Sequence, residues 1–184
     1  MDRLSFSHGQ TQSKLWLCNH LEPLLPKKAV VANLGCWHNL LGFMLLTRNE
    51  DNYDQVLGLD IDAEAITGAD TLCEGYMFGY KTTKIQNRNA DVNTYNLQGY
   101  NVTINCSTEH MTSEWFENID PNALVCIQTT DVDNQDEPWF ITNPTKTIDD
   151  FKTKYPMTEV LFSGSKSFVY PDVSYDRHMI IGRK

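Results

Sequence analysis

Two apolar stretches early in the chain predict its central structure. Residues 29–34 are almost all apolar and run into Gly35, a pattern typical of a buried strand that enters a tight turn. The nearly continuous apolar run 40–46 predicts a buried helix after that turn. Residues 57–62 then predict a second apolar strand with an acidic end. A strand, a glycine turn, a helix and a second strand in this order indicate half of an open α/β sheet.

The alternation of strands and helices continues to the end of the chain. The polar N-terminal residues 1–12 predict a loose segment, which leads into a helix that Pro23 ends. Asp62 is predicted to cap the helix after the second strand. The further expected strands are 84–90, 100–105, 123–128, 159–169 and 177–182, and the expected helices are 11–21, 63–76, 112–118 and 147–155.

The last two expected strands differ from the five before them. Only a short break at residues 170–173 separates them, and both alternate apolar and polar positions, as paired antiparallel strands do. The earlier strands are joined mostly through helices, as parallel strands are. We therefore predict an α/β, Rossmann-like fold, a mostly parallel seven-stranded sheet with a C-terminal antiparallel hairpin and helices on both faces. We expect residues 1–184 to form one domain, with 1–28 as an N-terminal helix or lid.

Composition and charge exclude several classes of protein. The chain has 184 residues and a net charge of −9, which disfavours the broad basic surface that binds nucleic acid. No stretch approaches the roughly 18 to 20 apolar residues that span a membrane, and the N-terminus lacks an apolar signal core. The five cysteines include no C-x-x-C pair, which favours reduced, buried thiols over disulfides or zinc. We expect a cytoplasmic protein without membrane segments.

Candidate chemistry gathers at the turn after the first strand. Gly35 lets the backbone approach a ligand closely because glycine has no Cβ, and the helix start beyond it offers free N–H groups to an anion. Asp60 ends the second strand 25 positions later, where a carboxylate can accept both hydroxyls of a ribose. A dinucleotide fingerprint needs three glycines in this turn. Only Gly35 is present, so a pyrophosphate lying on the loop is disfavoured.

This turn resembles the first motif of class I S-adenosylmethionine-dependent methyltransferases, in which a strand ends in an acidic or polar residue before a glycine-rich turn. Asn33 stands at the acidic position and Gly35 at the first glycine. Trp37 and Asn39 stand where further glycines are common. The resemblance implies S-adenosylmethionine as the cofactor. The residues that the resemblance implies bind this cofactor are Asn33, Gly35, Cys36, Trp37, Asp60, Ile61, Asp91, Val92 and Asn105.

The resemblance also assigns roles after the third and fourth strands. Asp91 matches an acid that receives the adenine amino group, and Asn105 would sit beside the sulfonium. The loop 107–110 resembles that of many small-molecule methyltransferases of this class, so Glu109 and His110 are the candidate catalytic bases. Histidine titrates near neutral pH, which suits that role. Alternatively, these two residues only cap or orient the short helix that follows.

Two further segments are expected to border the acceptor site. Polar side chains near the N-terminus are candidates for a lid, although a solvated helix face is the simpler explanation; they are His8, Gln10, Ser13 and Lys14. The acidic loop 129–146 contains Trp139 and Phe140 and is long enough to be functional, so we interpret it as part of the acceptor pocket. It lacks the central glycine and terminal glutamate of a calcium-binding EF-hand loop, so no metal site is predicted.

The sequence favours one function and leaves two others open. We predict methyl transfer from S-adenosylmethionine to a small-molecule or short-peptide acceptor, because little chain remains to recognise a larger one. A non-catalytic S-adenosylmethionine-binding or protein-interaction module is one alternative, which the single glycine of the turn favours. A nicotinamide-dependent oxidoreductase is the other, which the missing glycines disfavour. The sequence determines neither the acceptor nor the oligomeric state.

Overall fold

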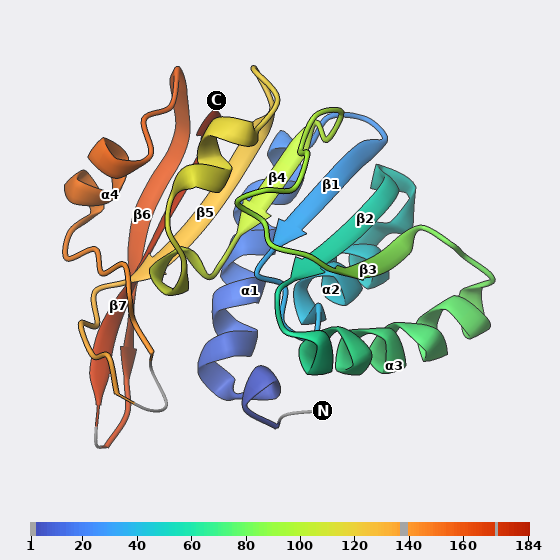
Figure 1. Ribbon diagram of the computed structural model, residues 1–184, viewed down its shortest axis with the longest axis horizontal. Coiled ribbons are helices and arrows are strands. Elements are labelled where there is room, and N and C mark those ends of the chain that lie inside the picture. The colour runs from blue at the N-terminus through green and yellow to red at the C-terminus, as the bar shows by residue number, and fades with distance from the viewer. Residues whose placement is uncertain (1–2, 137–139, 172) are drawn as a thin grey trace.

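A computed structural model of the protein describes residues 3–136, 140–171 and 173–184, except for the side chain of Tyr80. Seven strands of these residues form one sheet in the order β3-β2-β1-β4-β5-β7-β6 (Figure 1). Strands β1 to β5 pair in parallel, and β7 pairs antiparallel with both β5 and β6. The predicted mostly parallel sheet with a C-terminal antiparallel hairpin is confirmed. The strands are β1 (Ala29–Leu34), β2 (Tyr53–Asp60), β3 (Ile85–Asn89), β4 (Val102–Asn105), β5 (Leu124–Thr130), β6 (Glu159–Val169) and β7 (Ser174–Arg183).

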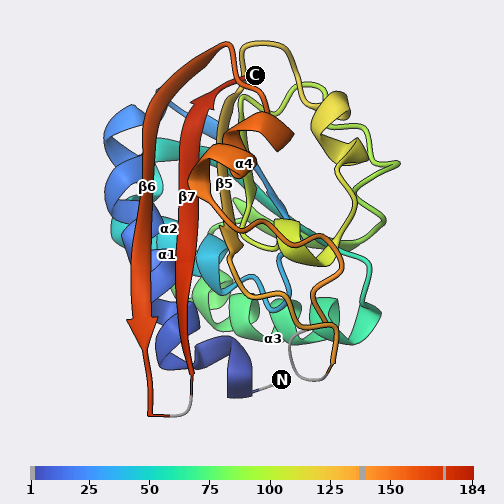
Figure 2. The same cartoon turned by 90° about the vertical axis from the view of Figure 1, so that its left-hand side faces the viewer.

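Helices cover both faces of the sheet, as Figure 2 shows from the side. Three helices pack on one face and a short fourth helix packs on the other. The α-helices are α1 (His8–Leu21), α2 (Leu40–Asn49), α3 (Ala63–Tyr80) and α4 (Ile148–Lys154). The short 3-10 helices are η1 (Arg3–Phe6), η2 (Glu22–Leu24), η3 (Glu50–Asn52), η4 (Thr108–His110) and η5 (Glu114–Asn118). Because both faces are covered, β5 is buried along its whole length.

Two apolar clusters hold the layers together. Leu17 of α1 and Leu45 of α2 belong to the cluster on one face, which also includes Val31 of β1. Trp115 of η5 and Phe151 of α4 belong to the cluster on the other face. Ala32, which follows Val31 in β1, belongs to that second cluster, because successive side chains of a strand face opposite sides. The apolar runs of the central strands therefore serve two cores.

The N-terminal segment is more regular than its polar pattern predicts. Arg3–Phe6 form η1, and α1 begins at His8, whereas the sequence predicts a loose segment to residue 12. The Ser7 side chain caps α1 by accepting a hydrogen bond from the Gln10 N–H at 3.4 Å. This cap extends the helix towards the N-terminus.

Several other boundaries differ from the prediction. Strand β2 runs from Tyr53 to Asp60 rather than over 57–62, and α3 continues to Tyr80 rather than ending at 76. The expected helix 112–118 is a 3-10 helix that begins only at Glu114, and no side chain caps its start. Burial of Trp115 and Phe116 fixes this segment, so packing rather than helix propensity sets its conformation. Strand β7 begins at Ser174, before the predicted residue, because it pairs with β6 along its whole length. No helix of the described chain is long and apolar enough to cross a bilayer.

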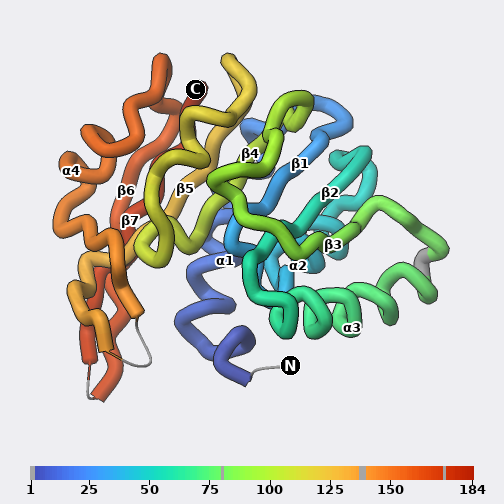
Figure 3. The backbone as a smooth tube through the Cα atoms, in the orientation of Figure 1, coloured from blue at the N-terminus to red at the C-terminus, as the bar shows by residue number. Residues whose placement is uncertain are grey.

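The carboxyl ends of the parallel strands meet at one edge of the sheet. The turns after β1, β2 and β3 and the loops after β4 and β5 therefore start side by side. Figure 3 shows that the N-terminal segment and the first turns of α1 come to this same edge. In open α/β sheets, ligands bind at this edge.

Candidate functional site

A cavity of about 740 Å³ opens at the carboxyl edge of the parallel strands. The segments that follow β1, β2 and β3 border one end of it. The other end, called the acceptor end below, is bordered by the segments after β4 and β5, the start of β7, and the N-terminal residues. The volume is typical of small-molecule sites. The predicted cofactor residues in its lining are Asn33, Gly35, Cys36, Trp37, Asp60, Ile61, Asp91 and Val92.

The turn after β1 has the backbone of a glycine-rich loop although it contains one glycine. Gly35 has a φ of +57°, and a Cβ there would lie 2.8 Å from Met111 Cε and 2.9 Å from Ser107 Cβ. Trp37 and Asn39 also have positive φ values, of 51° and 48°. These are the positions where the motif commonly has glycine, and a side chain in this region costs roughly 1–2 kcal/mol. The turn therefore has three residues at positive φ, of which only one is glycine.

A network of side-chain amides holds Asn39 in this conformation. Asn39 Oδ1 accepts hydrogen bonds from the Gly42 N–H at 3.1 Å, which caps α2, and from Asn33 Nδ2 at 2.8 Å. Asn39 Nδ2 donates to Asn87 Oδ1 of β3 at 2.7 Å. A Cβ at Gly58 would lie 2.5 Å from Asn39 Nδ2, so glycine at this position of β2 leaves room for the network. Asn33 lines the cavity, but its amide is engaged with Asn39.

Asn39→Ala is expected to lower the free energy of unfolding by about 2–3 kcal/mol, because it removes a helix cap and leaves alanine at a positive φ. Asn39→Gly removes the same amide contacts but tolerates the positive φ, so its loss should be about 1–2 kcal/mol smaller. Urea unfolding of both variants measures the difference. Equal losses would show that backbone strain at this position contributes nothing.

Asp60 ends β2 opposite the turn and has two backbone partners. Its Oδ2 accepts a hydrogen bond from the Trp37 N–H at 2.7 Å, and its Oδ1 accepts one from the Asp62 N–H at 3.0 Å. Each carboxylate oxygen can accept a second hydrogen bond, so the side chain can bind ligand hydroxyls while it holds the turn. Asp62 caps α3 by accepting from the N–H groups of Glu64 and Ala65, which confirms the predicted cap.

Asp91 lines the same end of the cavity as Asp60. Its carboxylate is exposed, and its Oδ1 accepts a hydrogen bond from the Asn93 N–H at 2.9 Å. Ile61 is 72% exposed, which is unusual for a large apolar side chain, and it lines the cavity together with the buried Val92. Two carboxylates with apolar side chains at one end of a cavity suit a nucleoside, whose hydroxyls and amino group donate and whose ring is apolar.

The end of β4 holds the next loop against the glycine turn. Asn105 is fully buried; its Nδ2 donates to Met111 Sδ at 3.2 Å, and its Oδ1 accepts a hydrogen bond from the Ser107 N–H at 2.9 Å. Ser107 Oγ donates to the Gly35 carbonyl at 3.1 Å. Asn105 itself is not among the residues that line the cavity, whereas Cys106 and Ser107 are. The structure therefore gives Asn105 a positioning role behind the cavity wall.

Glu109 is buried at the acceptor end, with 2% of its surface exposed. Its Oε1 lies 3.4 Å from Arg177 Nη2, while its Oε2 has no hydrogen-bond partner among the described residues. The Glu109 carbonyl accepts the N–H groups of Thr142 and Asn143 at 3.0 and 2.9 Å. The side chain faces Arg177 and does not cap η5. A buried carboxylate with an unpartnered oxygen can take a proton from a bound substrate.

His110 lies closer to solvent, with 43% of its side chain exposed. Its Nε2 lies 3.9 Å from Glu109 Oε1, and its Nδ1 lies 3.2 Å from the Phe140 carbonyl. Residues 140–142 of the loop after β5 line the same end of the cavity. Trp139, which we also expect at the acceptor pocket, lies outside the described residues. The two candidate bases are thus neighbours, one buried and one exposed.

Two buried cations complete the acceptor end. Arg177 of β7 is 7% exposed, and its Nη2 donates to the Cys106 carbonyl at 2.6 Å. Lys14 of α1 is 9% exposed, and its Nζ donates to Gln10 Oε1. Burial lowers the pKa of Lys14 to about 8 and raises the pKa of the Cys106 thiol to about 11. The sequence predicts Arg177 only as the first residue of a strand; a charged residue shortly before the apolar run 179–181 is the signal that marks it.

The four polar residues proposed as a lid separate in the structure. Gln10 and Lys14 line the cavity. Ser13 is buried, and its Oγ donates to the side chain of Gln128 in β5 at 2.8 Å. His8 contacts the tyrosine hydroxyl that follows β6, at 3.2 Å from its Nδ1. Gln10 and Lys14 therefore face the cavity, while Ser13 and His8 fix α1 to the sheet and the hairpin.

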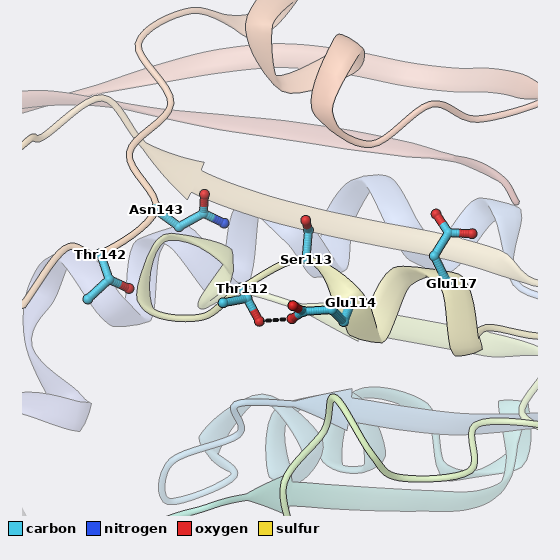
Figure 4. Close-up of a pocket in the computed structure, with 6 residues that line it drawn as sticks. All are labelled: Thr112, Ser113, Glu114, Glu117, Thr142 and Asn143. Atoms are coloured by element: carbon cyan, nitrogen blue, oxygen red, sulfur yellow. Dashed lines mark hydrogen bonds between the residues drawn. The ribbon is translucent and has the colours of Figure 1, made fainter.

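A smaller hollow of about 480 Å³ lies beside η5 (Figure 4). Its lining residues are Thr112, Ser113, Glu114, Glu117, Thr142 and Asn143. In Figure 4 the Thr112 hydroxyl points to the Glu114 carboxylate, while Glu117 lies apart from both. These acids are exposed, and no buried charge lies in this lining. We therefore place the functional site in the larger cavity.

Many solved structures match the chain over nearly its whole length, and three of them illustrate the likeness. N-methyltransferase NodS from Bradyrhizobium japonicum WM9 matches with a TM-score of 0.68 and 10% identity, and the match covers 100% of both chains. Magnesium protoporphyrin IX methyltransferase from Synechocystis PCC 6803, with S-adenosylmethionine bound, matches with a TM-score of 0.63 and 12% identity over 94% of this chain and 77% of that one. The [4+2]-cyclase SpnF matches with a TM-score of 0.68 and 9% identity over 95% and 82%. No protein-family model and no curated protein sequence match this chain.

These likenesses identify the fold. The chain has the class I S-adenosylmethionine-dependent methyltransferase fold, as the strand–turn–helix motif and the C-terminal hairpin predict. Identities of 10% and 12% carry no residue-by-residue assignment. Because a cyclase shares the fold with methyltransferases, the activity has to be argued from the cavity.

Proposed function

We propose that the protein transfers a methyl group from S-adenosylmethionine to a small-molecule or short-peptide acceptor. One observation carries the proposal: a single cavity joins a glycine turn, two carboxylates on neighbouring strand ends, and a buried carboxylate with an unpartnered oxygen. The matched methyltransferases, one of them with S-adenosylmethionine bound, support the choice of cofactor. The presence of Glu109 at the opposite end supports a reaction rather than binding alone.

The residues after β1, β2 and β3 fit S-adenosylmethionine. Gly35 allows the ligand to approach the backbone, Asp60 keeps acceptor positions for the ribose hydroxyls, and Asp91 offers an exposed carboxylate to the adenine amino group. Ile61 and Val92 supply apolar surface for the ring. When bound, S-adenosylmethionine supplies an electrophilic methyl group on a cationic sulfur.

The chain contributes positioning and proton removal. Glu109 Oε2 is buried in the cavity without a partner among the described residues, so it can accept a proton from a hydroxyl or amine of the acceptor. Arg177 holds the other carboxylate oxygen at 3.4 Å and orients it. His110, 3.9 Å away and partly exposed, can pass the proton to solvent. Enclosure by the N-terminal residues and by 140–142 orients the two reactants, which supplies much of the rate enhancement.

The cavity volume limits the size of the acceptor. A nucleoside in a cavity of about 740 Å³ leaves room for a small acceptor or a single peptide side chain. We propose that residues 1–28 serve as helix and lid within one domain of residues 1–184, because Leu4, Gln10 and Lys14 line the cavity. All five cysteines are free thiols, which supports a cytoplasmic location.

S-adenosylhomocysteine at 100 times its dissociation constant is expected to raise the melting temperature by roughly 5–10 °C. Binding at that ratio stabilises the native state by about 2.7 kcal/mol, and about 1 kcal/mol shifts a domain of this size by roughly 2–4 °C. NAD should cause no shift, because the turn lacks the glycines of a dinucleotide site. Differential scanning calorimetry measures both. A shift with NAD alone would favour the oxidoreductase, and no shift with either ligand would leave the proposal without its cofactor.

A non-catalytic S-adenosylmethionine-binding module is the second candidate. Trp37 and Asn39 favour it, because they stand where the motif commonly has glycine, and one matched structure is a cyclase. The two candidates differ in one measurement, the formation of methylated product from a broad panel of small acceptors. Binding of S-adenosylhomocysteine without any methylated product would favour the module.

A further inference from the structure

Three charged side chains are at least nine-tenths buried at the acceptor end of the cavity. Lys14 in α1, Glu109 in η4 and Arg177 in β7 have 9%, 2% and 7% of their surfaces exposed. All three line the cavity, although they come from distant parts of the chain. Side chains of these types are rarely buried so far unless they pair with each other or with a ligand.

The protein pairs only part of this charge. Arg177 Nη2 lies 3.4 Å from Glu109 Oε1 and donates to the Cys106 carbonyl, but Arg177 Nε has no partner among the described residues. Lys14 donates to the neutral side chain of Gln10, and none of the described carboxylates forms an ion pair with it. Two buried cations therefore face one carboxylate, and both cations have N–H donors to spare.

The proposed cofactor increases this imbalance, because its methionine end carries a sulfonium and an ammonium against a single carboxylate and so adds a net positive charge to the cavity. Asp60 and Asp91 lie at the other end, where the ribose and adenine engage them in the proposed function. An anion at the acceptor end is therefore strongly favoured by the local field. Leu4 and Ile141 give the same end apolar walls. A ligand that matches this end combines an anionic group with an apolar body.

We infer that the methyl acceptor is a small carboxylic acid with an apolar body, whose carboxylate binds Lys14 and Arg177 beside Glu109. The inference rests on the proposed function and names the substrate class of the same site. The two carboxylate oxygens accept hydrogen bonds from the spare donors of the two cations. The hydroxyl or amine of the acceptor forms the new bond to the methyl carbon and gives its proton to Glu109. The carbon–sulfur bond breaks with its electron pair on sulfur, which leaves S-adenosylhomocysteine.

Calorimetric titration of protein saturated with S-adenosylhomocysteine tests the substrate class. The probes are matched acids and primary amides, namely benzoate and benzamide, phenylacetate and phenylacetamide, and cinnamate and cinnamamide. Each pair differs in charge but little in shape. At least one acid is expected to bind roughly 10- to 100-fold more tightly than its amide. Equal or absent binding for every pair would overturn the inference, and so would tighter binding of phenyl phosphate than of any acid.

Lys14→Met tests the residue itself. Methionine keeps an unbranched apolar chain but removes the cation, so the preference for acid over amide should largely disappear while S-adenosylhomocysteine still binds. Lys14→Arg keeps the charge and should keep most of the preference. Lys27→Met is the matched control, because this exposed lysine precedes β1 and lies at the opposite edge of the sheet. An undiminished preference in Lys14→Met would show that Lys14 does not bind the carboxylate. Arg177 is a poorer test because its loss leaves Glu109 unpaired.

The pH dependence gives a readout that a purely structural Lys14 would not produce. Its pKa of about 8 results mainly from burial, which Arg177 reinforces and which Glu109, Cys106 and Cys18 oppose. Burial raises the thiol pKa values to about 11 for Cys106 and about 12 for Cys18, so both thiols stay neutral below these values. The affinity for the acid should fall between about pH 7 and pH 9 as Lys14 loses its proton, while the affinity for the amide should not. The same pH slope in Lys14→Met would contradict this assignment.

The two proposals fail in different ways. If S-adenosylhomocysteine binds but acids and amides bind equally, the proposed function stands and the carboxylate assignment is wrong. The panel is therefore also titrated without S-adenosylhomocysteine. If acids are preferred through Lys14 but S-adenosylhomocysteine does not bind, the anion site stands and the proposed function fails.

Discussion

Asp60→Ala is expected to weaken the binding of S-adenosylhomocysteine by roughly 10- to 150-fold, because a hydrogen bond to a charged group contributes about 1.5–3 kcal/mol. The proposed function gives this carboxylate the ribose hydroxyls. The structure adds a second consequence, since Asp60 Oδ2 accepts the Trp37 N–H at 2.7 Å and the variant removes that contact as well. The free energy of unfolding should therefore fall by about 1–3 kcal/mol. Calorimetric titration measures the affinity, and urea unfolding measures the stability.

Asp62→Ala is the matched control for this change. Asp62 caps α3 and is not among the residues that line the cavity. Its loss should cost about 1 kcal/mol of stability and leave the affinity for S-adenosylhomocysteine nearly unchanged. If Asp60→Ala binds the ligand as tightly as the parent protein does, the ribose assignment is wrong. The proposal that S-adenosylmethionine binds at this end of the cavity then loses its main support.

Glu109→Gln is expected to lower kcat by roughly 100-fold or more while the affinity for S-adenosylhomocysteine stays nearly constant. Glutamine keeps an oxygen that can face Arg177, but it cannot take a proton from the acceptor. Alanine is a poorer choice, because removal of one partner from a buried ion pair costs about 3–5 kcal/mol of stability. The measurement is the release of S-adenosylhomocysteine with an acceptor found in the product screen.

Two further variants show whether the loss of kcat is specific to Glu109. Glu114→Gln changes an exposed acid in the smaller hollow and should leave kcat unchanged. His110→Ala should lower kcat less than Glu109→Gln does, because His110 is partly exposed and water can replace it as a proton carrier. Unchanged turnover in Glu109→Gln would mean that the base lies elsewhere or that proximity alone drives the transfer. Loss of both fold and cofactor binding in that variant would make Glu109 a structural residue.

The sequence alone predicts the elements and the residues that border the end of the cavity next to β1, β2 and β3, because both depend on local signals. Apolar runs predict β1, β2 and β5, and Gly35 and Asp62 predict a turn and a helix cap from a few neighbouring residues. Asp60 and Asp91 enter one cavity because they lie at the ends of neighbouring parallel strands, whose carboxyl ends share an edge. The predicted bounds are inexact where packing outweighs local preference, as in the short helix expected over 112–118, which is a 3-10 helix that begins at Glu114 around buried aromatic side chains.

The sequence by itself determined the strand–turn–helix–strand unit and the closing hairpin, because apolar periodicity and turn residues act over short distances. Only the tertiary structure decided the acceptor end, where Lys14, Glu109 and Arg177 meet although helix, loop and strand carry them far apart in the chain. It also decided that Asn39 replaces a glycine, because its amide partners come from β1 and β3. Whether a charge or an amide is buried and paired depends on which distant segments pack around it, and no short stretch of sequence contains that information.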